Sequence, residues 1–184
     1  EDSVLAHWLR LGADGYRLDV VDELPDAFLA RLRKRLRELK PDAILIGEVW
    51  EDASNKVAYG VRRRYLTGRQ LDSVMNYPWQ KAILRYVRGE DGGEQLGERI
   101  MTIAENYPSD VLSAVMNILS THDTPRALTA LVDPTDAGRA ELARRHMDAP
   151  TRSRALHLLR MAAFLQFMLP GAPCIYYGDE AGMD

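Results

Sequence analysis

The sequence predicts an α/β fold in which parallel strands alternate with helices. Short apolar runs alternate with longer amphipathic segments along most of the chain, a pattern typical of strand–helix–strand units. Three of the apolar runs end at an acidic residue: Asp19, Glu48 and Asp123. The 184 residues are 46% apolar and 28% charged, which is the composition of a globular domain of ordinary size.

The N-terminal part of the chain predicts a helix followed by one complete strand–helix–strand unit. Apolar residues at spacings of three and four indicate a helix over residues 2–11. A strand is expected over residues 13–19, and a proline in its first turn opens an amphipathic helix over residues 25–40. A second strand over residues 43–48 completes the unit, and the two strands are expected to be parallel.

The alternation continues to the C-terminus after a long polar loop over residues 49–70, which is expected to contain a helical piece around residues 57–65. Strands are expected over residues 71–76, 113–120 and 171–177, and helices over residues 78–86 and 151–169. Another helix is expected after the interruption at Gly89–Gly93 and ends at about residue 106. Five parallel strands cannot close a barrel that requires eight. The pattern alone therefore leaves two alternatives, an open doubly wound sheet and the later part of a (β/α)8 barrel.

Charge and cysteine content restrict the classes of partner. A net charge of −3 and a pI near 5.9 give no reason to expect nucleic acid or an anionic membrane as a partner. No apolar run reaches the length of a transmembrane helix, and no signal peptide opens the sequence. The single cysteine, Cys174, excludes an internal disulfide and favours a cytoplasmic location. Cys174 itself is expected at a buried position in a strand.

Three further features are expected to be structural. A basic run is expected to lie on the solvated face of the second helix: Arg31, Arg33, Lys34, Arg35 and Arg37. The segment Arg62–Arg64 suggests either a phosphate site or a surface turn, and we favour the turn. The apolar stripe Met161, Phe164, Leu165 and Met168 is expected to be the buried face of the last helix.

The first two acids are placed for chemistry on a glycosidic bond. Acids just past the C-terminal ends of parallel strands are where (β/α) barrels hold catalytic groups, and two facing carboxylates can cleave a glycosidic bond. Asp19 is the candidate nucleophile, because Arg17 lies on the same side of its strand and favours the ionised carboxylate. Glu48 is the candidate general acid/base, because Trp50 and the aliphatic strand would form an apolar wall that raises its pKa. The alternatives are an Asp19–Arg17 pair that orders a loop, and a Glu48 that caps a helix.

The third acid lies in the segment His122-Asp123-Thr124-Pro125, which has two interpretations. Asp123 follows an apolar strand, as the other two acids do. The same segment also suits a helix start, with Asp123 or Thr124 as the capping residue and Pro125 in the first turn. Taken alone, the segment favours capping.

Four segments resemble, in order and spacing, signature regions of the α-amylase family of glycoside hydrolases: Gly15–Asp19, Gly47–Trp50, Ser120–Asp123 and, similar to that family's eighth barrel strand, Pro173–Glu180. Residues 48–56 and 75–78 look most like the neopullulanase, cyclomaltodextrinase and maltogenic-amylase branch. The resemblance implies the C-terminal portion of a (β/α)8 barrel, about strands 4–8 with their helices. Residues 1–184 would then be one partial catalytic domain, a fragment whose earlier strands lie before residue 1.

The resemblance also implies an activity and roles for six residues. The expected enzyme is a retaining glycosidase that cleaves α-1,4 bonds, with α-1,6 bonds as an addition, in maltooligosaccharides, cyclodextrins or pullulan. Asp19 would be the nucleophile, Glu48 the acid/base, and Asp123 the acid that binds hydroxyls of the reacting sugar. Substrate binding would involve Arg17, His122 and Trp50. Tyr77 and Trp79 would either stack on sugar rings or pack in the core, and packing is the commoner role.

Two alternative functions make different demands on Asp19, Glu48 and Asp123. Transglycosylation uses the same catalytic residues with a sugar hydroxyl in place of water. A non-catalytic barrel relative would be expected to have lost the three acids. The fragment alone is expected either to be inactive or to self-associate through an exposed sheet edge. No metal or other cofactor is expected in this chain, although the resemblance implies a calcium ion in the domain before residue 1.

Overall fold

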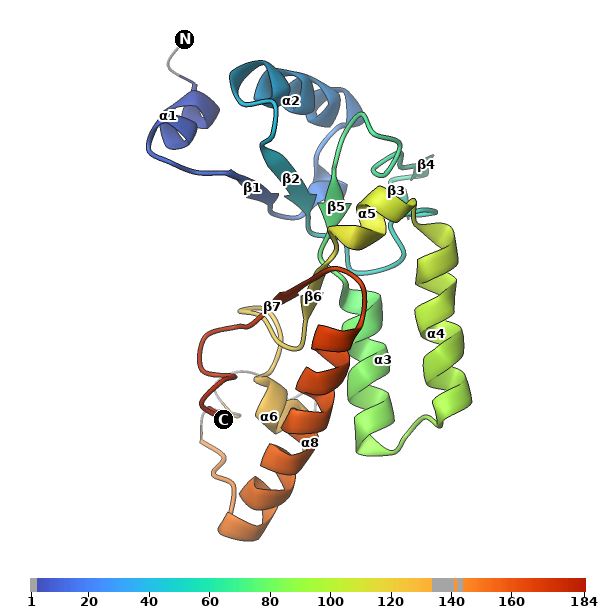
Figure 1. Cartoon of the computed structure of the whole chain (residues 1–184), viewed down its shortest axis with the longest axis vertical. Coiled ribbons are helices and arrows are strands. Elements are labelled where there is room, and N and C mark those ends of the chain that lie inside the picture. The colour runs from blue at the N-terminus through green and yellow to red at the C-terminus, as the bar shows by residue number, and fades with distance from the viewer. Residues whose placement is uncertain (1–2, 134–140, 142–143) are drawn as a thin grey trace. The chain divides into compact units, whose positions relative to one another are not determined.

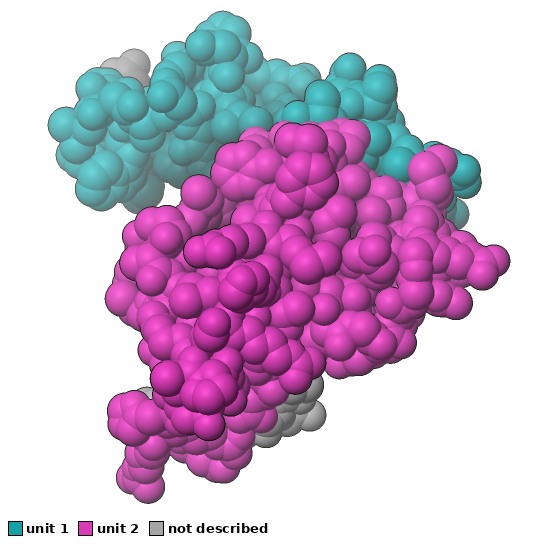
Figure 2. Space-filling model, turned by 60° about the horizontal axis from the view of Figure 1, so that its bottom comes forward, with its two compact units in different colours: residues 1–76, 103–116 teal, residues 77–102, 117–184 magenta. Residues whose placement is uncertain are grey.

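A computed structural model describes residues 3–133, 141 and 144–184 of the chain. It confirms the α/β class. The chain divides into two compact units, residues 1–76 with 103–116 and residues 77–102 with 117–184 (Figure 2). None of the described helices is both long enough and apolar enough to cross a membrane.

The first unit is built on a parallel sheet whose strand order is β1-β2-β5 (Figure 1). The strands are β1 (Gly15–Leu18), β2 (Ile44–Gly47) and β5 (Ser73–Val74). An isolated parallel bridge joins Met75, just after β5, to Met116. The strand–helix–strand unit predicted from the N-terminal sequence is confirmed.

Two glycines allow the chain to pass close to its neighbours in this sheet. A Cβ atom on Gly15 would overlap the backbone carbonyl oxygen of Ile44, its partner on β2. A Cβ atom on Gly47 would overlap the side chain of Leu71. Gly15 therefore requires glycine for space rather than for backbone conformation, whereas a side chain at Gly47 would have to displace the end of Leu71.

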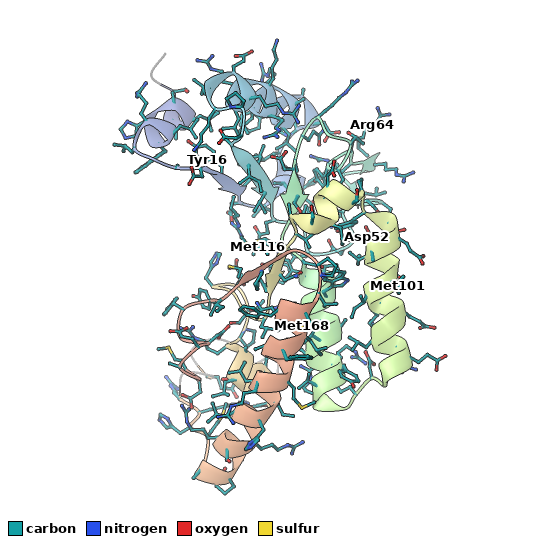
Figure 3. All side chains as sticks on the ribbon, in the orientation of Figure 1. Tyr16, Asp52, Arg64, Met101, Met116 and Met168 are labelled. Atoms are coloured by element: carbon teal, nitrogen blue, oxygen red, sulfur yellow. The ribbon has the colours of Figure 1, made fainter. Side chains whose placement is uncertain are left out.

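The helices of the first unit follow the predicted periodicity. Ser3 caps α1 (Val4–Arg10), and the hydroxyl of Tyr16 on β1 donates to the carbonyl of Leu5 at 2.6 Å (Figure 3). Helix α2 (Asp26–Leu39) begins after Pro25 and buries Leu29 and Leu36. The remaining elements that lie wholly in this unit are η1 (Val21–Glu23), the short α5 (Ser109–Ser113) and the strands β3 (Val57–Ala58) and β4 (Val61–Arg62).

The second unit packs helices around one apolar cluster. Helices α3 (Tyr77–Arg88) and α8 (Ala149–Met168) contact each other, and α6 (Ala127–Ala130) packs against α8. Strand β6 (Met116–Ile118) pairs with β7 (Ala172–Cys174), so Cys174 lies in a strand as predicted, and its side chain is half-buried. Helix α4 (Gly93–Asn106) has residues in both units.

The predicted helical piece around residues 57–65 is wrong. The segment forms a hairpin of β3 (Val57–Ala58) and β4 (Val61–Arg62). Tyr59 and Gly60 connect the strands with φ angles of 53° and 73°. Two consecutive residues with positive φ form the turn type that matches the twist of a two-residue hairpin, and this local geometry decides against a helix.

The predicted strand over residues 113–120 is shorter than expected. Ser113 ends helix α5, which follows Pro108, and β6 begins only at Met116. The buried Val111 belongs to this helix, and its carbonyl accepts a hydrogen bond from the Ser73 hydroxyl at 2.9 Å. The apolar run therefore divides between a helical turn and a strand.

The sequence predicts that the basic residues of α2 lie on a solvated face. This prediction is wrong for one of them. The Arg33 side chain is buried, donates to the carbonyl of Ala43 at 2.9 Å and forms an ion pair with Asp72. The other Asp72 carboxylate oxygen accepts the backbone N–H of Leu45 on β2 at 2.7 Å. Arg33 thus connects the helix to the sheet, and its charge is compensated where it is buried.

The predicted buried stripe on the last helix is wrong for three of its four residues, and only Leu165 packs against the apolar cluster. Met161, Phe164 and Met168 are exposed, whereas α8 buries Ala155, Leu159, Ala162 and Gln166. The spacing of four, three and four residues places these four on one face. The small side chains of Ala155 and Ala162 allow close approach at this face, on which Leu159 is the large apolar residue.

Candidate active site

Asp19 and Glu48 directly follow two neighbouring parallel strands of the first unit. Leu18 on β1 is paired in register with Gly47 on β2, so each acid is the first residue beyond its strand. The backbone N–H of Glu48 donates to the carbonyl of Leu18 at 3.1 Å. The sheet therefore places both acids at one edge, as the sequence predicted.

Arg17 contacts both acids. Its Nη1 lies 2.6 Å from Asp19 Oδ1, and its Nη2 lies 3.2 Å from Glu48 Oε2. Its Nε donates to the sulfur of Met75 at 3.3 Å, which fixes the plane of the guanidinium group. The interpretation of the Arg17–Asp19 pair as a mere loop contact is too narrow, because the same guanidinium bridges two carboxylates.

The Glu48 carboxylate is held by donors on both oxygens. Oε2 accepts the backbone N–H of Val20 at 2.8 Å, and Oε1 accepts the indole N–H of Trp50 at 3.1 Å. The Glu48 side chain is only 4% exposed. Trp50 therefore presents its polar edge to Glu48, whereas the sequence had suggested an apolar wall. No helix begins at Glu48, so the capping alternative is wrong.

The Asp19 carboxylate, in contrast, is open to solvent. Its side chain is 73% exposed, and Arg17 is the partner that holds it. A ligand can therefore reach the Asp19 carboxylate directly, whereas neighbouring groups cover most of the Glu48 side chain. An exposed and a buried carboxylate that share one arginine can take different roles in one reaction.

Val20, between Asp19 and η1, has a strained backbone. Its φ and ψ angles are 41° and 58°, in the left-handed region that β-branched residues rarely adopt. This conformation directs the Val20 N–H to Glu48. Strain of this kind persists where surrounding contacts impose it, and it is concentrated at functional sites.

Replacing Val20 by Asn is expected to stabilise the protein by about 1 kcal/mol, because asparagine tolerates the left-handed region. The Val20 side chain is 46% exposed, so little packing is lost, and the backbone N–H to Glu48 is kept. Urea denaturation measures the change. Val61→Asn is the matched control, since Val61 is also exposed and lies in β4 without positive φ. A Val20→Asn protein less stable than the wild type would contradict the strain argument.

The second unit carries His122 and Asp123, beyond the end of β6. His122 Nε2 lies 2.9 Å from Asp123 Oδ2, and both side chains are accessible. The Thr121 hydroxyl accepts the backbone N–H of Asp123 at 3.2 Å, while the Thr124 hydroxyl accepts that of Thr121 at 2.8 Å. The following helix, α6, starts at Ala127 with Arg126 as its N-cap residue. Capping by Asp123 or Thr124 is therefore wrong, and Asp123 lies on a loop.

The start of this loop is tied to the segment that follows β7. The hydroxyl of the buried Ser120 donates to Asp179 Oδ2 at 2.6 Å. Burial raises the pKa of Asp179, and the hydrogen bond from Ser120 opposes the shift. The guanidinium carbon of Arg126 lies 4.7 Å and 4.3 Å from the ring centroids of Tyr176 and Tyr177. These contacts fix both ends of the segment that carries His122 and Asp123.

The two other aromatic candidates do not face a ligand. Tyr77 and Trp79 are 0% and 1% exposed. Packing is therefore their role, and stacking on a sugar ring is wrong for both.

The structure thus brings together Arg17, Asp19, Glu48 and Trp50 in one unit, and His122 with Asp123 in the other. The backbone N–H of Val20 is a site group that sequence reasoning missed, and no residue pattern marks it, because nearly every residue carries such a donor. Within the described ranges, no group of three His, Cys, Asp or Glu side chains is arranged to hold a metal ion.

Comparison with known proteins identifies relatives over the whole chain. A family model described as "Alpha amylase, catalytic domain" matches residues 1–184. A cyclomaltodextrinase of Geobacillus thermopakistaniensis is 34% identical over 98% of this chain and 26% of its own length. Neopullulanase 2 of Thermoactinomyces vulgaris is 34% identical with the same coverage. The chain therefore spans about a quarter of the length of these relatives.

Two solved structures are also similar to this chain over almost its whole length. The ligand-free cyclic α-maltosyl-(1→6)-maltose hydrolase from Arthrobacter globiformis superposes with a TM-score of 0.75 at 26% identity. The match covers 98% of this chain and 34% of that protein. A debranching enzyme from Nostoc punctiforme gives a TM-score of 0.77 at 26% identity, over 97% of this chain and 34% of its own.

Proposed function

Because the chain belongs to the α-amylase family of glycoside hydrolases, we propose that this protein is a retaining glycosidase acting on α-glucans. The observation that carries the proposal is the Arg17 guanidinium, which contacts an exposed and a buried carboxylate at the ends of neighbouring parallel strands. Two carboxyl groups in one site are what cleavage of a glycosidic bond requires.

Asp19 is the nucleophile in this proposal. Its carboxylate oxygen attacks the anomeric carbon as the bond to the leaving oxygen breaks, and a glycosyl ester forms. The contact with Arg17 supports this role, because the guanidinium group holds the carboxylate at the end of β1. The exposure of Asp19 gives the sugar access to it.

Glu48 is the general acid/base. It gives a proton to the leaving oxygen in the first step and takes one from water in the second, as the ester is hydrolysed. The hydrogen bonds from Val20 and Trp50 hold the carboxyl group in one orientation, which keeps the proton aligned with the glycosidic oxygen. Trp50, 36% exposed, also offers surface to a substrate.

Asp123 and His122 are proposed to bind hydroxyls of the reacting sugar. Both are accessible, and their loop is fixed by Ser120 and Arg126. The strands β1, β2, β5, β6 and β7 are proposed to be the fourth to eighth of a barrel within one catalytic domain. A calcium ion, a cytoplasmic location and self-association of the chain are predictions that come from the sequence alone.

The substrates proposed are cyclodextrins, pullulan and maltooligosaccharides. Relatives at 34% identity bear the names cyclomaltodextrinase and neopullulanase, which supports α-1,4 bonds, with α-1,6 bonds in addition. Transglycosylation is the second candidate, since it differs only in the acceptor of the glycosyl ester.

The test is digestion of these three substrates by the full-length protein, with the products followed by NMR. We expect the first-formed reducing end to keep the α configuration, because two displacements restore it. Products longer than the substrate would identify transglycosylation. An inverted product would overturn the assignment of Asp19, and no turnover of any α-glucan would overturn the proposed activity.

A further inference from the structure

A cavity of about 810 Å³ in the first unit is unrelated to the acids of the candidate active site. It lies between α2, the hairpin and the loop that leads to β5, with the end of α4 beside it. Its volume is within the range of pockets that hold small ligands. The lining consists of Ala30, Ser54, Arg62, Arg63, Arg64, Leu66, Thr67, Arg69, Gln70, Asn106 and Pro108, and it includes no carboxylate.

Arg62, Arg64 and Arg69 give this cavity an uncompensated positive charge. All three residues are exposed, and within the described part of the chain none of the three guanidinium groups has a hydrogen bond or an ion pair. Arg64 is labelled in Figure 3. Three guanidinium groups around one cavity repel one another unless an anion lies between them. Guanidinium groups also bind phosphate and carboxylate in a paired geometry.

Arg63 differs from its neighbours and holds the segment in place. It is 7% exposed, its Nε lies 2.9 Å from Asp26 Oδ1, and its Nη1 donates to the carbonyl of Asp22 at 3.2 Å. Residues on either side of a buried residue in an extended chain face the other way. Anchoring Arg63 therefore turns Arg62 and Arg64 outward. The surface turn favoured from sequence is wrong for these residues, since Arg62 ends β4 and the turn begins only at Tyr65.

Gln70 supplies an independent indication of a ligand. Its side chain is 5% exposed and lines the cavity, yet Oε1 has no hydrogen-bond partner. A buried amide without partners destabilises the fold unless a ligand or water completes its bonds. Its oxygen accepts and its nitrogen donates, so the amide matches a hydroxyl group, which does both. A fully ionised phosphate could satisfy only the nitrogen.

We propose that this cavity binds a sugar phosphate, with the phosphate on Arg62, Arg64 and Arg69 and a sugar hydroxyl on the Gln70 amide. Two acids beside the lining already have partners: Asp26 pairs with Arg63 at 2.9 Å, and the Asp52 carboxylate accepts from Ser54 at 2.6 Å and from Asn106 at 2.7 Å. A second cavity of about 470 Å³ shares Ala30 and Arg69 with the first and is also basic, with Lys34 and Arg37 in its wall.

The test is isothermal titration calorimetry of the full-length protein with glucose 6-phosphate, inorganic phosphate and glucose. We expect glucose 6-phosphate to bind most tightly, inorganic phosphate more weakly, and glucose not at all. Arg62→Ala/Arg64→Ala should weaken binding of glucose 6-phosphate by roughly tenfold or more, because each hydrogen bond to a charged group contributes substantially. Gln70→Met should lower its affinity to that of inorganic phosphate and leave the latter unchanged.

Arg154→Ala/Arg160→Ala is the matched control, since it removes from α8 two exposed arginines whose guanidinium groups have no partner among the residues that the structure describes. Equal losses in both double variants would show attraction to net charge only and overturn the site. Failure of both anions to bind the wild type would also overturn it, and equal binding of the two would overturn the sugar part. Binding is measured without turnover, so this result is independent of the proposed glycosidase activity.

Discussion

Glu48→Gln in the full-length protein is expected to lower kcat on α-glucans by roughly 10²- to 10⁴-fold, the usual contribution of a general acid/base. The amide cannot give or take the proton, although it fills the same space. One of the two donors to Glu48, the Val20 N–H or the Trp50 indole, will face an amide NH₂ and lose its partner. We therefore expect a stability loss of about 1 kcal/mol beside the much larger loss in rate.

Glu51→Gln is the matched control for this variant. Glu51 lies three residues further along, its side chain is 59% exposed, and it forms an ion pair with Lys56. We expect this change to leave kcat within about twofold, since exposed pairs contribute little. Asp19→Asn should lower kcat at least as strongly as Glu48→Gln does. Near-normal kcat in either the Asp19 or the Glu48 variant would remove that residue from the mechanism.

Arg33→Met is expected to destabilise the protein by about 3 kcal/mol, measured by urea denaturation. The methionine keeps the apolar stem and removes the charge, which leaves Asp72 without its cation and the Ala43 carbonyl without its donor. Burial lowers the pKa of the Arg33 guanidinium, and the facing Asp72 carboxylate opposes that shift. The effect should fall on stability, since Arg33 has no contact with the proposed catalytic acids.

Arg35→Met tests whether burial is the cause. Arg35 lies on the same helix, and its pair with Glu38 at 3.2 Å is nearly half exposed on both sides. We expect a loss below about 0.5 kcal/mol for this variant. Similar losses for the two substitutions would mean that the Arg33–Asp72 pair does not connect α2 to the sheet.

The sequence by itself determined the parallel strands and the position of the acids along them. Gly15–Leu18 and Ile44–Gly47 are short apolar runs on either side of a helical period, and that local pattern is enough to predict β1, α2 and β2. Because parallel strands end at the same edge, Asp19 and Glu48 were predicted to lie there together. The hairpin of β3 and β4 was missed, since its turn depends on backbone angles at Tyr59 and Gly60.

Only the tertiary structure decided which polar groups are buried and what they contact. Arg33 lies four residues after Leu29 and three before Leu36, on the buried face of α2, and Asp72, far along the chain, supplies the charge that pairs with it there. Tertiary packing also determines the ion pair between Arg17 and Glu48. It likewise buries the Gln70 amide oxygen without a hydrogen-bond partner among the described residues. Periodicity reports the face of an element, whereas burial depends on what packs against that face, and distant segments of the chain supply those contacts.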